Sequence, residues 1–220
     1  MFIFSLVCHE AAHAFVSFKQ GDDTAFRSGQ ITLNPIPHIR RELFGTVIVP
    51  ILSFLMGGWM MGWGSAPYDP HWAYAHPKRA AKMALAGPSA NLFLMLLSVL
   101  AIHLGVAAHV FYPPESISFI HIASAYREGI ASTAAGLLSI FFSLNLILFI
   151  FNLFPLPPLD GSSILAFFMS DEDARKYLSV IGSPAYQWIG LFVAWRLFMW
   201  IYPPIHLFVI NILYPGVHYG

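Results

Sequence analysis

The sequence predicts an all-α polytopic membrane protein, and three observations support this prediction. Of the 220 residues, 57% are hydrophobic and 10% are charged, whereas a soluble domain has roughly 25% charged residues. The mean hydropathy is +0.66. Five apolar stretches have about the 20 residues that a membrane-spanning helix needs. These stretches are residues 2–18, 43–64, 83–111, 131–154 and 186–213. We expect about four of them to cross the membrane as helices.

The charges and the single cysteine exclude several classes of protein. Eleven basic and eleven acidic residues cancel, so no net positive field would recruit nucleic acid. Cys8 is the only cysteine, which excludes an internal disulfide. No polar segment is long enough for a second folded domain. We therefore predict one integral-membrane domain over residues 1–220, with its core in residues 1–165 and a C-terminal helix at residues 186–213.

The first apolar stretch, residues 2–18, is not a signal peptide. No Lys or Arg precedes it, and His9, Glu10 and His13 interrupt its apolar core. Because the stretch is slightly short for a full span, we expect the natural N-terminus to lie further upstream.

The second stretch, residues 43–64, differs in composition from the others. It contains Pro50, the pair Gly57 and Gly58, and then Gly62 and Gly64. These residues disfavour one continuous helix. We therefore predict a re-entrant or broken segment, which is tolerated at membrane depth where protein buries it or where it lines a wet cavity.

The sequence HEAAH, residues 9–13, has the chemistry of a zinc site. On a helix of 3.6 residues per turn, His9 and His13 lie one turn apart on the same face, with Glu10 beside that face. Two imidazoles could hold one zinc ion, and Glu10 could take a proton from a water activated there. A chance match is the alternative. This alternative is weakened by the energetic cost of placing such groups in a membrane span. A charged group at the centre of a span costs about 2.5 to 3.5 kcal/mol, so three polar groups within five residues need a compensating partner.

A hydrolytic zinc site needs a third protein ligand, and Asp160 is the best candidate. It follows the fourth apolar stretch in NLFPLPPLDGSS, where three prolines end the helix and Gly161 frees the backbone beside the carboxylate. An ordinary proline-rich loop with a solvated Asp is the alternative. Three other acidic residues lie in polar loops without such a frame, namely Glu115, Glu128 and Glu172.

These segments together resemble a known family. HEAAH and NLFPLPPLDG match both signatures of the site-2 protease family of intramembrane zinc metalloproteases, and LAGPSANLFLML from Leu85 resembles its middle core helix. The resemblance implies one Zn²⁺ per chain on His9, His13 and Asp160, with Glu10 as the catalytic base. It also implies that Asn152 contacts the substrate or the active-site backbone. The family hydrolyses peptide bonds in or near transmembrane helices of other membrane proteins.

The chain resembles a short form of the family, without an inserted peptide-binding domain. The regulation that larger members build into extra domains is then either absent or supplied by a regulatory membrane partner. We expect the lipid bilayer and membrane proteins with a transmembrane helix as the other partners.

The metal site also predicts the topology. If all five stretches crossed, each face of the membrane would carry five loop Lys and Arg residues, and the positive-inside rule would give no orientation. His13 and Asp160 can share a metal only if their helices run in one direction, so one intervening stretch must not cross. If residues 43–64 do not cross the membrane, nine of the ten loop Lys and Arg residues lie on one side of it. We therefore expect a multi-pass protein of a prokaryotic cell membrane, with the site toward the cytoplasm.

Two further features allow more than one interpretation. Residues 28–40 alternate around Ile31 and Leu33, which predicts either a short strand, able to pair with an unwound substrate, or a plain connecting loop. Arg196 lies about ten residues into the last span, where it could pair with a group inside the bundle or extend toward the membrane surface.

Two functions of other classes remain as alternatives. A polytopic metal transporter would place polar residues along a path on several helices, whereas these converge at one point. A catalytically silent membrane scaffold would not need a complete set of ligands with a base.

Overall fold

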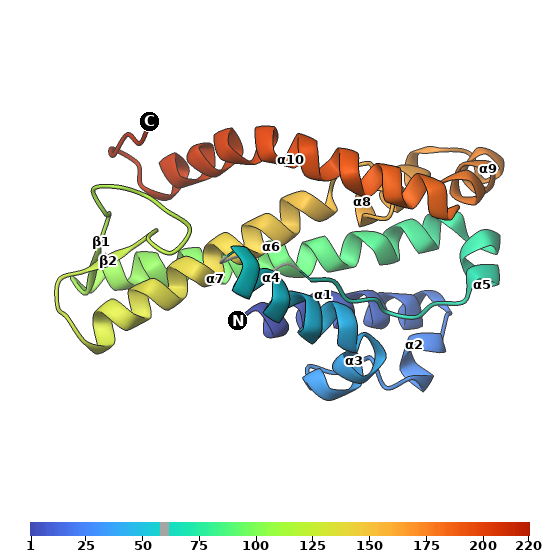
Figure 1. Cartoon of the computed structure of the whole chain (residues 1–220), viewed down its shortest axis with the longest axis horizontal. Helices are drawn as coiled ribbons and strands as arrows, with labels where there is room; N and C mark the ends of the chain where they lie inside the picture. Colours follow the sequence, from blue (N-terminus) through green and yellow to red (C-terminus); the bar gives the residue numbers. More distant parts are fainter. Residues whose placement is uncertain (58–61) are drawn as a thin grey trace.

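A computed structural model describes residues 1–57 and 62–220 of the chain. Four long helices dominate it and confirm the all-α prediction (Figure 1). They are α1 (Phe2–Gln20), α6 (Pro77–Ala107), α7 (Ile130–Asn152) and α10 (Pro184–Leu213). Within the described residues, α6, α7 and α10 are long and apolar enough to cross a membrane. The expected fourth crossing, α1, is 19 residues long and carries the polar HEAAH sequence at its centre.

Shorter elements join the long helices, some at the two ends of the molecule and some beside its middle (Figure 1). They are α2 (Thr24–Arg27), α3 (Pro35–Arg41), η1 (Phe44–Ile48), α4 (Val49–Gly57), α5 (Pro70–Ala75), β1 (Phe111–Tyr112), β2 (Ser124–Ala125), α8 (Asp160–Ile164), η2 (Leu165–Phe168) and α9 (Asp171–Ile181).

Helix α6 is the centre of the fold, because it packs against both α1 and α7. A continuous core fills the space between α6, α7 and α10. Its fully buried side chains include Ile102 of α6, Phe142 of α7 and Ile210 of α10. Away from this core, many large apolar side chains are exposed, as expected for helices that face lipid. Helix α6 thus holds α1 and α7 together, and these two helices also touch each other at Phe4 and Phe141.

The ends of the helices follow local sequence signals. Helix α1 ends at Gly21, whose φ of 104° is left-handed and favours glycine. Helix α6 begins six residues earlier than the hydropathy predicts. Its first turn is charged and so lies outside the apolar stretch, but Pro77 favours the start of a helix there. The helix also ends earlier, since His109 has a left-handed φ of 54°. The apolar pattern therefore located the helices, and the capping residues set their limits.

The broken second stretch is only partly helical. Residues 44–57 form one turn of π-helix, η1, followed by α4, and this apolar helix is too short for a span. Residues 58–61 lie outside the described part of the chain, and residues 62–69 have no regular secondary structure. The structure thus agrees with the prediction that this stretch is not one continuous membrane-spanning helix.

The short β element lies at a different place from the predicted one. Of the two alternatives for residues 28–40, the strand around Ile31 and Leu33 is wrong, because residues 31–33 form bends and α3 follows directly. Asn34 caps α3, its side-chain oxygen accepting from the Ile36 N–H, and Pro35 begins the helix. The two-stranded antiparallel sheet joins β1 and β2 in the connection between α6 and α7.

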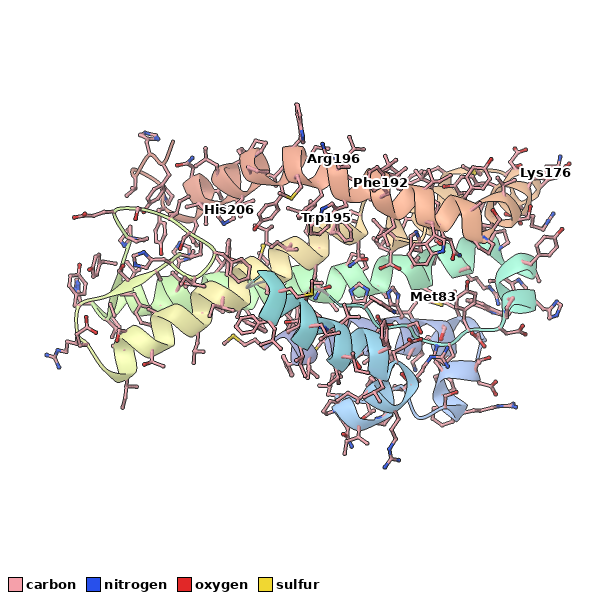
Figure 2. All side chains as sticks on the ribbon, in the orientation of Figure 1. Met83, Lys176, Phe192, Trp195, Arg196 and His206 are labelled. Atoms are coloured by element: carbon pink, nitrogen blue, oxygen red, sulfur yellow. The ribbon has the colours of Figure 1, made fainter. Side chains whose placement is uncertain are left out.

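Arg196 lies on the exposed side of α10 (Figure 2). Within the described residues, none of the ion pairs includes it. Of the two alternatives for Arg196, an ion pair inside the bundle is therefore not formed among the described residues. Helix α10 instead approaches the rest of the protein through Gly190, where a Cβ atom would collide with the backbone oxygen of Pro157. This contact places α10 against the loop that precedes Asp160.

Candidate metal centre

Helix α1 carries three polar side chains into the protein interior. His9, Glu10 and His13 are all buried, and the two imidazole rings meet edge to face with centroids 4.6 Å apart. This arrangement follows from helical geometry, since residues four apart lie on one face. The neighbouring Cys8 is half-buried on another face of the helix.

Asp160 reaches the same point from the opposite side. It is the first residue of α8, after the turn in which Pro155, Pro157 and Pro158 leave the end of α7. Gly161 lets α8 pack closely on that end, because a Cβ atom there would collide with the carbonyl oxygens of Leu153 and Phe154. The role of Gly161 is thus close approach rather than the backbone freedom predicted from the sequence.

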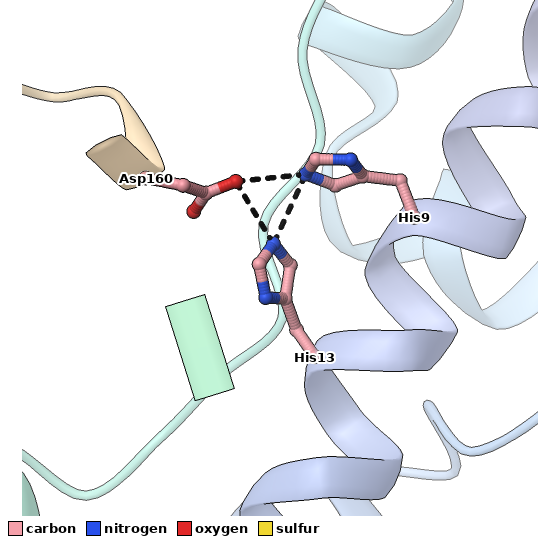
Figure 3. A group of neighbouring side chains, drawn as sticks. All are labelled: His9, His13 and Asp160. Atoms are coloured by element: carbon pink, nitrogen blue, oxygen red, sulfur yellow. Dashed lines mark hydrogen bonds and ion pairs between the residues drawn. The ribbon is translucent and has the colours of Figure 1, made fainter. Parts of the chain in front are cut away.

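Three ligand-type atoms converge at this point (Figure 3). His9 Nε2 and His13 Nε2 are 3.0 Å apart, and Asp160 Oδ2 lies 3.2 Å from the first and 3.3 Å from the second. Tetrahedral Zn²⁺ with bonds of about 2.0 to 2.1 Å requires ligand atoms to be about 3.3 Å from one another. The triangle therefore has the size of one face of a zinc coordination tetrahedron.

The hydrogen bonds of the two Nδ1 atoms also support a metal site at this point. His13 Nδ1 lies 2.7 Å from the backbone oxygen of Met83, and His9 Nδ1 lies 2.7 Å from Asn91 Oδ1. Because both oxygens can only accept, each Nδ1 must carry the proton, and in a neutral imidazole Nε2 then presents a lone pair. Asp160 Oδ2 is buried without a hydrogen-bond donor. Three acceptor atoms thus face one another, and a cation among them would relieve their repulsion.

Helix α6 covers one side of the cluster through Gly87. A Cβ atom at this position would collide with His13 Nε2 and come within 2.5 Å of His9 Nε2. Only glycine allows the backbone of α6 to lie this close to both rings. Met83, which accepts from His13, lies one turn earlier on the same helix (Figure 2).

Glu10 lies beside the chain segment at the end of the broken stretch, at Gly64. A Cβ atom at Gly64 would be 2.9 Å from Glu10 Oε1, so this segment passes directly over the carboxylate. A small cavity of about 10 Å³ next to Glu10 is lined in part by His38, Thr46 and Ser65. The predicted base is therefore enclosed by η1, α3 and this segment, on the α1 face adjacent to the cluster.

Asn152, the fifth predicted site residue, lies at the C-terminal end of α7. It is the last residue of α7, and its side-chain amide donates to the Leu148 carbonyl one turn earlier, at 2.9 Å. The structure thus brings His9, His13 and Asp160 together, places Glu10 next to them, and leaves Asn152 at the start of the proline-rich turn.

Sequence reasoning missed the groups that orient the two histidines. They are the Met83 carbonyl, Asn91 and, behind it, Asn145. A backbone carbonyl leaves no trace in a sequence. The two asparagines do leave one, because a fully buried amide within an apolar span is costly unless it is hydrogen-bonded.

The fold and the cluster define a helical integral-membrane protein with a metal-binding type of site in its interior. The chain belongs to peptidase family M50, the site-2 protease family, whose model matches residues 1–197. This result confirms the family resemblance of the sequence motifs.

Curated relatives carry zinc metalloprotease names. The chain is 35% identical over 164 residues to "Putative zinc metalloprotease YwhC" of Bacillus subtilis, an alignment that covers 74% of this chain and 64% of the relative. It is 29% identical over 191 residues to "Putative zinc metalloprotease Rip2" of Mycolicibacterium smegmatis, covering 87% and 62%. The Rip2 protein of Mycobacterium tuberculosis (Erdman) is 28% identical over 210 residues, covering 96% and 68%. The chain thus spans slightly less than two thirds of the first two relatives. No solved structure matches it.

Proposed function

We propose that this chain is a zinc-dependent intramembrane endopeptidase that hydrolyses peptide bonds in or near transmembrane segments of membrane-protein substrates. One observation carries the proposal: the 3.0 to 3.3 Å triangle of His9, His13 and Asp160, with Glu10 beside it, inside a helical membrane fold. The M50 family and the names of its relatives support zinc as the metal.

Each side chain has a distinct role in this proposal. His9 Nε2, His13 Nε2 and Asp160 Oδ2 would hold one Zn²⁺ per chain. When bound, zinc polarises a carbonyl and makes a water molecule acidic enough to attack it near neutral pH. Glu10 accepts the proton of the attacking water and passes it to the leaving amide nitrogen. The enclosed position of Glu10 keeps its carboxylate away from bulk solvent, next to the reacting atoms.

The substrate must unwind before cleavage, because the peptide bonds of a helix are enclosed by its own hydrogen bonds. We assign to Asn152 the task of holding the unwound strand, on the basis of the family resemblance and its place at the start of the turn leading to Asp160. The whole region 1–220 acts as one membrane domain.

The same geometry supports a cytoplasmic orientation. Within the described part of the chain, η1 and α4 together cover 14 residues, which is about two thirds of a span. With this stretch not crossing, nine of the ten loop Lys and Arg residues lie on the side of the metal centre. By the positive-inside rule that side is the cytoplasm of a prokaryotic cell.

Of the two alternative functions, metal transport fits the structure less well. A transporter needs successive metal sites along a path. Within residues 1–57 and 62–220, His9, His13 and Asp160 form the one cluster of three metal-ligating side chains. Zinc flux measured in proteoliposomes distinguishes the two functions directly.

The decisive experiment compares the native chain with Glu10→Gln on a panel of purified single-span membrane proteins. We expect Glu10→Gln to keep its zinc content and to lose cleavage by a factor of about 10² or more, since a general base contributes about 10² to 10⁴. Glu115→Gln, an exposed change far along the chain, is the control and should cleave normally. Cleavage by Glu10→Gln at the native rate contradicts the proposal, as does a native chain that contains no zinc.

A further inference from the structure

We propose that Asn91 of α6 and Asn145 of α7 form a hydrogen-bond relay that sets the tautomer of His9 and so prepares its Nε2 atom for metal binding. The metal-binding part of this inference rests on the proposed function. Asn145 is then a positioning residue, because it acts on the site through Asn91 without touching it.

The relay is a continuous chain of short hydrogen bonds across three helices. His9 Nδ1 of α1 lies 2.7 Å from Asn91 Oδ1, and Asn91 Nδ2 donates to Asn145 Oδ1 at 3.0 Å. Asn145 Nδ2 then donates to the Phe141 carbonyl, in its own helix, at 2.8 Å. A second donation from Asn91 Nδ2 reaches the Ser5 carbonyl of α1 at 3.4 Å.

The direction of the chain is fixed at its far end. The Phe141 carbonyl can only accept, so Asn145 must turn its NH₂ group toward it and its oxygen toward Asn91. Asn91 must then turn its NH₂ group toward Asn145, which leaves its oxygen facing His9. His9 can only donate to that oxygen through Nδ1–H, so Nε2 is left with a lone pair that points at Asp160.

Burial makes this direction costly to reverse. Asn91 and Asn145 are both fully buried, so water does not reach them to replace a lost partner. A flipped Asn91 amide would set its oxygen against Asn145 Oδ1 and the Ser5 carbonyl, leaving buried acceptors unpaired. The relay thus selects one of the two neutral tautomers of His9.

His9 and His13 differ in the kind of group that orients each ring. His13 is oriented by the backbone carbonyl of Met83, which no side-chain substitution removes. His9 is oriented by a side chain whose own orientation depends on another side chain. Substitutions at Asn91 and Asn145 should therefore affect His9 selectively.

Two measurements test the relay. The first uses metal-free protein at pH about 9, where free imidazole is neutral: ¹⁵N NMR of the His9 ring, assigned by its loss in His9→Gln, reports which nitrogen carries the proton. We expect Nδ1–H in the native chain and a mixture of tautomers in Asn91→Leu and Asn145→Leu. The second measures zinc affinity by chelator competition. We expect Asn91→Leu to bind about 10- to 100-fold more weakly, and Asn145→Leu about tenfold or less.

The double variant separates a relay from simple packing. Because Asn145 acts through Asn91, Asn91→Leu/Asn145→Leu should bind zinc as weakly as Asn91→Leu alone, whereas independent packing losses would multiply. Asn145→Asp should restore affinity, since a protonated Asp offers the same donor and acceptor. Ser98→Ala removes a buried α6 hydroxyl that bonds within its own helix, and it should change neither measurement.

Several outcomes overturn the relay. They are multiplied losses in the double variant, an unchanged His9 tautomer in Asn145→Leu, or equal losses in Asn145→Asp and Asn145→Leu. If Asn91→Leu does not fold, the comparison of Asn145→Leu with Asn145→Asp decides alone. A native chain that binds no zinc would contradict the proposed function, while the NMR of the metal-free protein would still test the relay.

Discussion

Gly87 and His9 are in such close contact that a single added methyl group at Gly87 would come within 2.5 Å of His9 Nε2. The neighbouring His13 Nε2 would collide with the same methyl group. Helix α6 contributes none of the three clustered ligand atoms, yet its backbone limits how far the two imidazole rings can move.

Replacing Gly87 by Ala should damage the metal centre while leaving the fold in place. The methyl group must push both rings or the helix aside, which separates the ligand atoms. We expect zinc affinity to fall at least tenfold, as for loss of a supporting group, measured by chelator competition. Gly136→Ala on α7 is the matched control, because nothing lies within 4 Å of its Cβ position. Normal zinc binding by Gly87→Ala would refute the close contact.

A substitution at Gly64 should affect the base Glu10 without affecting metal binding by the three ligands. An added Cβ would press on the Glu10 side chain at 2.9 Å, but Glu10 is not among the three clustered ligand atoms. We expect Gly64→Ala to lower the rate of cleavage severalfold and to keep a native zinc content. Gly57→Ala, whose Cβ position is open, is the control. Loss of zinc together with activity would show that this segment supports the ligands themselves.

Removal of the metal should lower the stability of the protein. The site joins α1 to α8 through three side chains, so zinc binds the folded state and not the unfolded one. At a free zinc concentration 1,000 times the dissociation constant, the folded state gains about 4 kcal/mol. Thermal unfolding in detergent, with and without a chelator, measures this difference. Asp160→Asn, which removes one ligand charge, should abolish most of the shift, and a full shift in that variant would exclude Asp160 as a ligand.

Substitution of Arg196 should leave the site unaffected. Its side chain is exposed on α10 and, within the described residues, makes no ion pair (Figure 2). Because a central Arg costs about 2.5 to 3.5 kcal/mol on insertion, Arg196→Leu should insert at least as well as the native chain. Zinc content and cleavage should match those of Arg196→Lys. A selective loss of cleavage in Arg196→Leu would instead mean that this face contacts the substrate.

The sequence predicted the fold well where a pattern is local. The ends of α1, α7 and α10 were located to within two residues, because apolar runs mark lipid-facing helices. The strand predicted around Ile31 was wrong, since Asn34 and Pro35 start a helix immediately after it. An alternation of three residues is too weak a signal to outweigh a helix cap.

The site was predictable only in part, and the reason is physical. The spacing of His9 and His13 predicts that they share a metal, and the family resemblance adds Asp160 as the third ligand; the structure brings the three together. The orienting groups come from α6 and α7, far away in the sequence, and only packing brings Asn91 and the Met83 carbonyl to the rings. The closeness of Gly87 also depends on packing, because it requires the positions of two helix axes.

The position of Gly87 has a consequence for the design of inhibitors. With the backbone of α6 lying directly against both imidazole rings, a hydroxamate or other chelating compound has no room to approach from that side. Such a compound must approach the three ligand atoms from a side that α6 does not cover. On the Glu10 side of the site, the segment at Gly64 lies against the carboxylate, and selectivity could be built against this segment.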